Sequence, residues 1–388
     1  MEFFKVEKSC GQTSARAGVL QVEHGKVQTP VLMTVGTKAN VKSVDTQILQ
    51  SLGVQVVLAN TFHLHIFPGE SLVASFGGLH KFMSWPGPMF TDSGGFQVFS
   101  MGHGNVADEI KGKGMRHGKR TLLKIDESGA VFKSYRDGAE KILTPEISMQ
   151  IQHKLGADMV AAFDECTPFH AGKIYTEKSM HRTHRWLKRC QSEMARIGSK
   201  QKLFGIVQGG VFEDLREISC NFVANAGTSG ICIGGSLGRN KQQMASVVEF
   251  CMKRLPKEKP VHLLGVGDFP DLVLAVESGV DSFDCVSPTR NARHGLLFSR
   301  EFPSWKMNLT ASIFKADPRP ICKSCQCPVC QKYSRGYLHF LLRANEMLGM
   351  QLCTMHNIFF MHDFMRKMRE AILHDNFPSF KNEVLRNF

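Results

Sequence analysis

Several features that would place this chain in other protein classes are absent from its sequence. No apolar run approaches the roughly 20 residues that a helix needs to cross a membrane, and residues Met1–Lys5 do not begin a signal peptide. There is also no low-complexity tract and no linker between independent domains. We therefore expect a cytoplasmic protein that does not bind membranes, with its 12 cysteines reduced unless they bind a metal.

What is present is a long and basic chain. Its 388 residues, 43% of them hydrophobic, suffice for one large barrel or two ordinary domains. The formal net charge is +13, and an enzyme this basic usually meets a polyanion or an acidic surface. Because the positive residues are spread along the chain, this charge indicates a class of partner and no particular site.

Apolar runs alternate with segments of helical spacing. Continuous apolar runs are typical of parallel strands buried on both faces. The predicted strands are Thr29–Val35, Val54–Asn60, Met89–Thr91, Asp158–Phe163, Leu203–Val207, Gly230–Ile233, Val261–Val266 and Asp281–Phe283. Predicted helices between them include Pro145–Leu155, Thr176–Ile197, Phe212–Asn225 and Lys241–Leu255. About eight such units favour an α/β fold of the (β/α)8 TIM-barrel type, with a doubly wound sheet as the alternative.

Polar residues or glycines directly follow several predicted strands. They are Asp92, Asp164, Gln208, the pair Gly234-Gly235 and Asp284. One polar residue in such a place is usually a cap or a turn. In a barrel, however, the C-terminal ends of all strands meet at one mouth, where active sites lie. Five such ends around one rim therefore predict a functional site.

The stretch from Phe283 to Gly295 is the most informative. Asp284 follows an apolar run, and Arg290 and Arg293 come just beyond it. A carboxylate can attack a sugar carbon, and arginines hold phosphates. Alone, the stretch would also fit a turn aspartate beside solvated arginines. Together with the other rim residues it indicates chemistry on a nucleic acid.

Two segments do not fit the repeat. Residues Gly102–Arg120 are rich in glycine, lysine and histidine and lack an apolar period, which indicates an exposed insertion. Its basic residues either contact nucleic acid or form a solvated loop. The other segment, at about residues 316–362, carries a metal-binding motif, and we interpret it as a subdomain of one catalytic domain that spans residues 1–388.

The metal-binding motif consists of three cysteines and one histidine. Three thiolates and an imidazole suit tetrahedral Zn²⁺, and because they fill all four positions the zinc would be structural. The histidine lies on an amphipathic stretch, Asn345–His362, which the metal would clamp to the cysteine loop. Reduced cysteines without metal are the alternative, and Cys322 is a competing ligand. The favoured set is Cys325, Cys327, Cys330 and His356.

These motifs resemble those of the bacterial queuine tRNA-ribosyltransferase family, also called tRNA-guanine transglycosylases. The resemblance runs from about Thr29 to His356. It rests on Thr91-Asp92-Ser93-Gly94-Gly95-Phe96-Gln97, Phe163-Asp164-Glu165-Cys166-Thr167-Pro168, Val207-Gln208-Gly209-Gly210, Phe283-Asp284-Cys285 and the Cys₃His set. It implies a barrel with an inserted zinc subdomain and a homodimer. It also implies that guanine at the wobble position of tRNAs with GUN anticodons is exchanged for a 7-deazaguanine.

The resemblance also implies roles for individual residues. Asp284 would be the nucleophile that forms a covalent ribosyl-enzyme intermediate, as in retaining glycosidases, and Asp92 the general acid and base. Arg290 and Arg293 would grip the anticodon backbone. The base would be bound by Asp92, Ser93, Phe96, Asp164, Gln208, the Gly235 backbone and Leu264.

This sequence departs from the family's pattern around the double glycine. The family usually has Leu-Ala-Val or Leu-Ser-Gly and then Gly-Glu, where this chain has Ser236-Leu237-Gly238-Arg239-Asn240. Asp268-Phe269 and Phe67 are further departures, and the insertion of residues 102–120 is longer than usual. A valine aligned with Gly238 narrows the base pocket in members that use 7-aminomethyl-7-deazaguanine, and queuine users have glycine there. We therefore expect queuine to be accepted, with 7-aminomethyl-7-deazaguanine as the alternative.

Two other functions remain open at this point. One is a non-catalytic accessory subunit that only holds tRNA or a partner, against which the presence of both Asp92 and Asp284 argues. The other is the archaeal relative that acts elsewhere in tRNA, which carries additional C-terminal RNA-binding domains.

Overall fold

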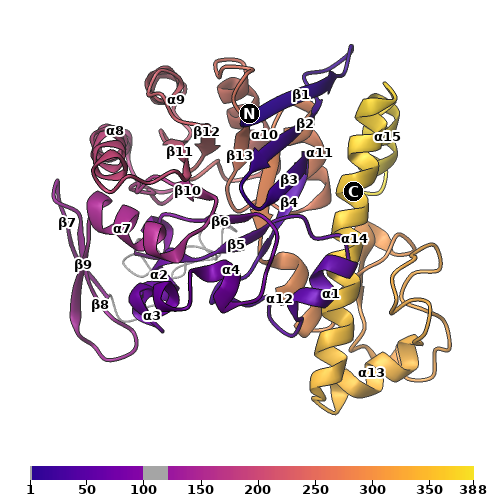
Figure 1. Ribbon diagram of the computed structural model, residues 1–388. Coiled ribbons are helices and arrows are strands. Elements are labelled where there is room, and N and C mark those ends of the chain that lie inside the picture. The colour runs from indigo at the N-terminus through magenta and orange to yellow at the C-terminus, as the bar shows by residue number, and fades with distance from the viewer. Residues whose placement is uncertain (1, 99–120) are drawn as a thin grey trace.

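Eight parallel strands close into a barrel in the computed structural model, which describes residues 2–98 and 121–388 (Figure 1). Asp284 pairs with Met33 where the last strand meets the first, so the sheet is closed and the doubly wound alternative is wrong. The strands are β4 (Val31–Val35), β5 (Val57–Ala59), β6 (Met89–Thr91), β10 (Met159–Ala161), β11 (Lys202–Val207), β12 (Gly230–Ile233), β13 (Val261–Leu263) and β14 (Ser282–Cys285).

All eight lie within or overlap the predicted strands, and four of them are shorter than predicted. One difference is at the first, where Thr29 ends a different strand, β3, and Pro30 separates it from β4. A proline has no backbone N–H and cannot donate to a ladder, so it breaks the predicted run.

Along each strand, one residue points into the barrel and the next points outward to the helices. Met33, Phe90, Phe204 and Ile206 belong to the interior cluster, whereas Leu32 packs in the outer one. Both faces are therefore apolar, as the continuous hydrophobic runs predicted. An antiparallel sheet of β1 (Phe4–Ser9), β2 (Arg16–Val22) and β3 (Gly25–Thr29) adds its own apolar side chains to the interior cluster.

Helices surround the barrel strands. Those before the C-terminal segment are α1 (Thr46–Ser51), α2 (Thr61–Ile66), α3 (Glu70–Ser75), α4 (Leu79–Phe82), α7 (Pro145–Leu155), α8 (Lys173–Arg196), α9 (Glu213–Ala224), α10 (Lys241–Met252), α11 (Phe269–Glu277) and α12 (Ser287–Arg293). Helix α7 matches its prediction because its ends are encoded locally. Thr144 accepts a hydrogen bond from the Ile147 N–H, and Gly156 ends the helix at φ 73°.

A second antiparallel sheet, like the first, was not predicted. It consists of β7 (Leu122–Ile125), β8 (Ala130–Lys133) and β9 (Glu140–Leu143) and projects at the left of Figure 1. The predicted insertion, Gly102–Arg120, lies outside the described residues.

The C-terminal segment packs against the barrel through its last two helices. It contains β15 (Leu296–Phe298), η1 (Pro303–Trp305), β16 (Lys306–Asn308), η2 (Ser312–Phe314), α13 (Arg335–Arg343), α14 (Met347–Leu373) and α15 (Phe377–Leu385). Along α14, His362 contacts the Thr34 hydroxyl at 2.8 Å, and Arg369 donates to the carbonyls of Gly18 and Thr29. No helix among the described residues is long and apolar enough to cross a membrane.

Candidate active site

The predicted rim residues do lie at the C-terminal ends of the barrel strands. Asp92 comes directly after β6, Gln208 after β11, and Asp284 lies near the end of β14. Asp164 follows β10 by three residues, and the double glycine follows β12. For Asp92, Gln208 and the double glycine the local reason is the same, because the apolar strand ends at its first polar or flexible residue.

Asp284 is held through one of its two carboxylate oxygens. The Gly265 N–H donates to Oδ1 at 2.9 Å, and Nε2 of His262 lies 3.2 Å from the same oxygen. The side chain is 18% exposed. The other oxygen, Oδ2, has no hydrogen-bond partner within residues 2–98 and 121–388 and is on a side chain that solvent can reach.

Asp92 has a different environment. Its Oδ1 accepts hydrogen bonds from the Thr61 N–H at 2.9 Å and the Gly94 N–H at 3.2 Å, and its Oδ2 accepts one from the Asn60 amide. Burial raises the pKa of Asp92 to about 7, and the charge of Asp284 adds to this rise, while the three donors oppose it. Near neutral pH this carboxyl therefore exchanges a proton readily, as a general acid and base must.

Asp164 is buried and held by two neighbours. Ser93 Oγ donates to its Oδ1 at 3.0 Å, and Gln208 Nε2 donates to its Oδ2 at 2.7 Å. Burial raises the pKa of Asp164 to about 6, and these hydrogen bonds oppose the rise. Gln208 Oε1 is buried and has no hydrogen-bond partner in the described part of the chain. A buried amide oxygen of this kind is an interaction left for another molecule.

The loop after β12 approaches Gln208 closely. Gly235 has φ 77°, and a Cβ there would lie 2.3 Å from Gln208 Oε1, so a residue with a side chain does not fit. Gly238 has φ 125°, and a Cβ on it would lie 2.7 Å from Gln243 Cγ on α10. Leu264 follows β13 and is half-buried, and Phe96 is 40% exposed.

Three residues near the rim were missed in the sequence. His262 lies inside β13 and contacts Asp284, and Asn60 follows β5 and contacts Asp92. The buried guanidinium of Arg216 donates to carbonyls at both rim loops, including Val207 at 3.1 Å and Ser236 at 3.3 Å. Asn60 had the same signal as the predicted residues, a polar side chain at a strand end, whereas His262 and Arg216 lie within a strand and a helix and carry no such signal.

The two arginines lie on α12, which follows β14 directly. Arg290 is exposed. Arg293 is half-buried and donates to the Thr289 carbonyl at 2.8 Å, and burial together with the charge of Arg290 lowers its pKa. Both cations are therefore on the helix that starts at the rim.

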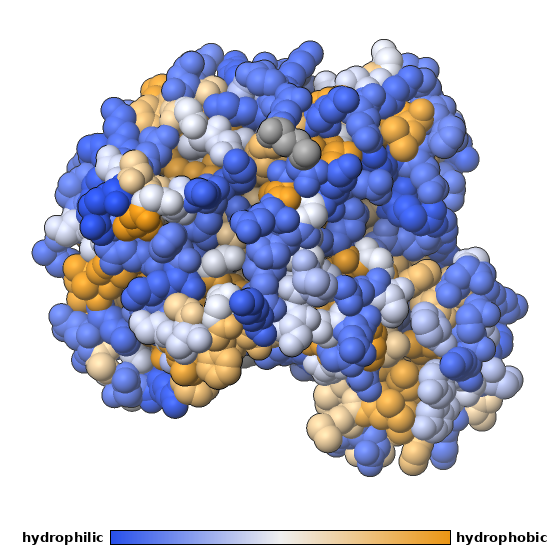
Figure 2. All heavy atoms as spheres, viewed as in Figure 1, coloured by the Kyte–Doolittle hydropathy of each residue, from blue (hydrophilic) through white to orange (hydrophobic). Residues whose placement is uncertain are grey.

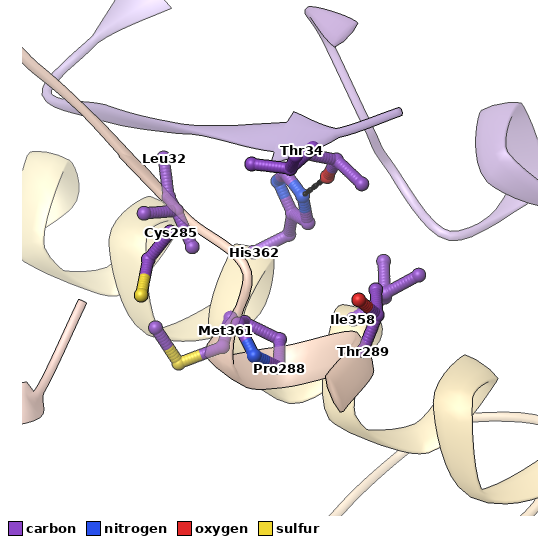
Figure 3. Close-up of a pocket in the computed structure, with 9 residues that line it drawn as sticks. Leu32, Thr34, Cys285, Pro288, Thr289, Ile358, Met361 and His362 are labelled. Atoms are coloured by element: carbon purple, nitrogen blue, oxygen red, sulfur yellow. Dashed lines mark hydrogen bonds between the residues drawn. The ribbon is translucent and has the colours of Figure 1, made fainter. Parts of the chain in front are cut away.

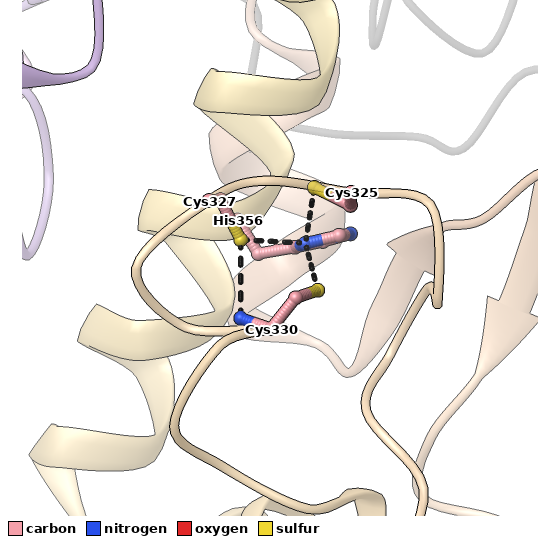
Figure 4. A group of neighbouring side chains, drawn as sticks. All are labelled: Cys325, Cys327, Cys330 and His356. Carbon is pink, nitrogen blue, oxygen red and sulfur yellow. Dashed lines mark hydrogen bonds between the residues drawn. The ribbon is translucent and has the colours of Figure 1, made fainter.

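The four predicted metal ligands lie together, as Figure 4 shows. His356 Nδ1 is 3.9, 3.4 and 3.4 Å from the sulfurs of Cys325, Cys327 and Cys330. A tetrahedral zinc with its usual bond lengths would separate nitrogen and sulfur by about 3.6 Å. His356 Nε2 lies 2.6 Å from the Phe298 carbonyl, which fixes the proton on Nε2 and leaves Nδ1 free to bind an ion. These buried residues can hold a metal ion, and Cys322 is outside the group.

A second group of possible ligands lies at the opposite end of the barrel, where Asp158 precedes β10. His24 Nδ1 is 2.8 Å from Oδ1 of Asp158, and His80 Nε2 is 3.3 Å from Oδ2. The two imidazoles stack with ring centres 3.5 Å apart and an interplanar angle of 11°. Nearly parallel rings do not aim their nitrogens at one ion, so we interpret the group as a structural contact between three segments.

A small cavity lies behind β14, away from the rim side chains (Figure 3). Its lining includes Cys285, Pro288, Met361 and His362, so it separates β4 and β14 from helices α12 and α14. It encloses about 10 Å³, which is room for roughly one water molecule. It is too small for a nucleobase.

Comparisons with known proteins agree with this geometry. Residues 10–388 match the family model described as queuine tRNA-ribosyltransferase. A protein of that name from Roseiflexus sp. (strain RS-1) is 44% identical over 394 residues, covering 98% of each chain. Another from Herpetosiphon aurantiacus is 45% identical, covering 99% of this chain and 92% of the relative. A putative queuine tRNA-ribosyltransferase from Archaeoglobus fulgidus is 42% identical, with 95% and 96% covered.

Proposed function

The chain belongs to the queuine tRNA-ribosyltransferase family of pentosyltransferases, and we propose that it is a tRNA-guanine transglycosylase for tRNAs with GUN anticodons. Guanine leaves the wobble ribose and a 7-deazaguanine, queuine or 7-aminomethyl-7-deazaguanine, replaces it in the queuosine pathway. The observation that carries the proposal is the unequal pair of rim carboxyls. Asp284 presents an oxygen to which no described residue donates, and the pKa of Asp92 is raised to about 7.

In the first displacement, Asp284 attacks C1′ of the ribose. The bond from C1′ to N9 of guanine breaks, its electron pair stays on the base, and protonated Asp92 supplies the proton that the base takes up. In the second, the Asp92 carboxylate removes the proton from N9 of the incoming base. That nitrogen then attacks C1′ and releases Asp284. Each displacement inverts C1′, so the configuration is retained overall.

The buried polar groups suit guanine. The Asp164 carboxylate accepts hydrogen bonds from N1–H and the 2-amino group, and Ser93 keeps it oriented. The Gly235 N–H donates to O6, and Gln208 donates to it with the Nε2 hydrogen that does not bind Asp164. Adenine presents the opposite pattern at these positions and leaves the buried groups unpaired, which is costly. Phe96 and Leu264 enclose the base from its two faces, and stacking contributes roughly 1–3 kcal/mol per base.

The wobble nucleotide must leave its stack to reach the rim, as in other enzymes that modify bases. Arg290 and Arg293 bind the phosphates beside it, and the net charge of +13 supports association with a polyanion.

One structural zinc per chain is bound by the Cys₃His group. The four donors leave no open position, so the ion joins the cysteine loop to α14 and takes no part in the reaction. The α14 contact with α12 then places the metal one helix away from the phosphate-binding arginines.

A homodimer is the proposed assembly. Figure 2 shows apolar surface on the lower right lobe, where Figure 1 places α13. Its exposed side chains include Phe340 at 60% and Met347 at 83%, with Tyr337 and Leu348 also exposed. A surface this apolar is typical of an interface, and light scattering of a Phe340→Ser variant would test it.

The incoming base is proposed to be queuine, with 7-aminomethyl-7-deazaguanine as the alternative. A glycine at Gly238 has no branched side chain to occupy the space that the cyclopentenediol of queuine requires.

The deciding experiment is exchange of labelled guanine in a tRNA with a GUN anticodon, chased separately with each 7-deazaguanine. A tRNA with another base at the wobble position is the control. Release of label only from the GUN tRNA supports the enzyme. Tight tRNA binding without release would instead favour the non-catalytic accessory subunit.

A further inference from the structure

His262 is a buried histidine in contact with the proposed nucleophile. It lies on β13, has no exposed surface, and packs against the Phe90 ring with centres 5.3 Å apart at 21°. Its Nε2 is 3.2 Å from Asp284 Oδ1, and its Nδ1 is 2.9 Å from Ser282 Oγ. Both partners are on β14, so one imidazole bridges two neighbouring barrel strands.

These contacts select one tautomer. An ionised carboxylate only accepts hydrogen bonds, so Nε2 must carry the proton that it shares with Asp284. Nδ1 is then an acceptor, and the Ser282 hydroxyl donates to it. Ser282 is itself buried, so this hydroxyl has little access to water. The result is a fixed chain of donors from Ser282 through His262 to Oδ1 of Asp284.

We propose that His262 is a positioning residue that assigns different tasks to the two oxygens of Asp284. This inference rests on the proposed function. His262 and the Gly265 N–H hold Oδ1, and Oδ2 forms the bond to C1′ as the bond from C1′ to guanine breaks. In the ribosyl ester, Oδ1 is the neutral carbonyl oxygen and Oδ2 is the ester oxygen.

The donors also act on the second displacement. When the incoming base attacks C1′, the electron pair of the bond between C1′ and Oδ2 returns to the carboxylate. A hydrogen bond to a charged oxygen is about twice as strong as one to a neutral oxygen. The contact from His262 therefore stabilises the departing carboxylate more than the ester, and the intermediate breaks down instead of accumulating.

The test separates positioning from simple packing. His262→Phe keeps a ring against Phe90 but removes both nitrogens, and His262→Gln restores a donor that can reach Oδ1. Trapped adduct and single-turnover rates of its formation and breakdown are measured with guanine-34 tRNA stem-loops. His362→Phe is the matched control, because that buried histidine also contacts a hydroxyl, Thr34 Oγ1.

We expect His262→Phe to slow breakdown of the adduct by roughly tenfold to a hundredfold, the scale of losing one hydrogen bond to a charged group. The fraction of enzyme present as adduct should rise at steady state, Gln should recover much of the loss, and His362→Phe should behave as wild type. Equal rates in folded His262→Phe would overturn the inference while leaving the proposed function intact. Absence of any adduct in the wild type would instead overturn the proposed function.

Ser282→Ala gives an independent measurement if the phenylalanine variant does not fold. Without the serine hydroxyl the imidazole is free to take its other tautomer, so adduct breakdown should slow in the same direction by a smaller factor. The asparagine of His262→Asn is too short to reach Oδ1. The inference would also be overturned if adduct breakdown were unchanged in Ser282→Ala and both His262→Gln and His262→Asn were fully active.

Discussion

The charge of Asp284 contributes to the raised pKa of Asp92, so the two rim carboxyls are close enough to interact electrostatically. Burial is the larger cause of the shift. Removal of the Asp284 charge should therefore lower the pKa of Asp92, so the covalent and proton-transfer steps must be followed individually to separate the two residues.

Asp284→Asn should abolish the covalent adduct. The amide has the size of the carboxylate but lacks its charge and nucleophilicity, so exchange should fall by roughly a thousandfold or more. The measurement is gel retention of tRNA after denaturation, in the presence of a slow incoming base. An adduct that persists in the asparagine variant would show that another residue attacks the ribose.

Adduct formation should depend on protonated Asp92. Because its pKa is raised to about 7, the rate should be highest below that pH and fall as pH rises through it. Asp92→Ala should abolish turnover but leave tRNA binding largely intact, since phosphate contacts dominate affinity. Mass-spectrometric mapping of the adduct to Asp92 would reverse the proposed roles.

The same shift predicts a stability effect with a definite sign. The folded-state pKa of Asp92, about 7, lies above its ordinary value of 3.8, so the folded state binds more protons between these values. The contribution of this residue to stability is greatest below about pH 4 and is lost as pH rises to about 7. Asp92→Asn should stabilise the protein by on the order of 1–4 kcal/mol at pH 8 relative to pH 4. Urea titrations at the two pH values measure this.

Removal of one metal ligand should loosen the C-terminal segment before the barrel. Cys327→Ala should lose the single zinc and destabilise the protein by several kcal/mol, since structural zinc sites contribute binding free energies of about 10–16 kcal/mol. Cys322→Ala is the control, because that thiol lies outside the ligand group and should leave metal content unchanged. Metal-replete protein without zinc would reject the site.

Arg290→Ala and Arg293→Ala should each weaken tRNA binding and flatten its salt dependence by about one charge, or roughly 0.7–0.9 in the logarithmic slope. Arg290 is exposed and should act by charge alone. Binding constants at several salt concentrations give the slope. If both slopes equal that of the wild type, the arginines belong to the solvated surface.

Gly238→Val should reduce kcat/KM for queuine far more than for 7-aminomethyl-7-deazaguanine, because a branched side chain would fill the space that we propose for the cyclopentenediol. The positive φ of this residue and its contact with Gln243 make any side chain costly. Gly238→Ala carries the same backbone cost with less volume and is therefore the necessary control. Equal losses for both bases in the valine variant would leave backbone strain as the only effect.

Much of this site followed from sequence because its signals are local. Asp92, Asp164 and Gln208 each interrupt an apolar run, and Cys325, Cys327 and Cys330 share one short loop. The contacts of His262 are not local, because they exist only when β13 pairs with β14. In the sequence, His262 lies inside an apolar strand and looks like a core-packing residue.

The parts of the fold that were missed have weak patterns. Lys124 interrupts β7, and β9 begins with Glu140 and Lys141, so neither is a continuous apolar run by which buried strands are recognised. The metal motif also does not indicate where α14 ends, and the predicted helical stretch stopped at His362. The helix continues to Leu373 because its apolar face packs on the barrel beyond the last ligand.

The contacts of α14 with the first strands can form only late in translation. His362 and Thr34 are 328 positions apart, and Arg369 and Gly18 are 351 apart. At about 5–20 residues per second, the ribosome makes the first strands roughly 15–70 s before the helix that covers them. During this interval β4 also lacks its partner β14, so the barrel cannot close. The apolar faces of the first strands therefore stay without their final partners until almost the whole chain has been translated.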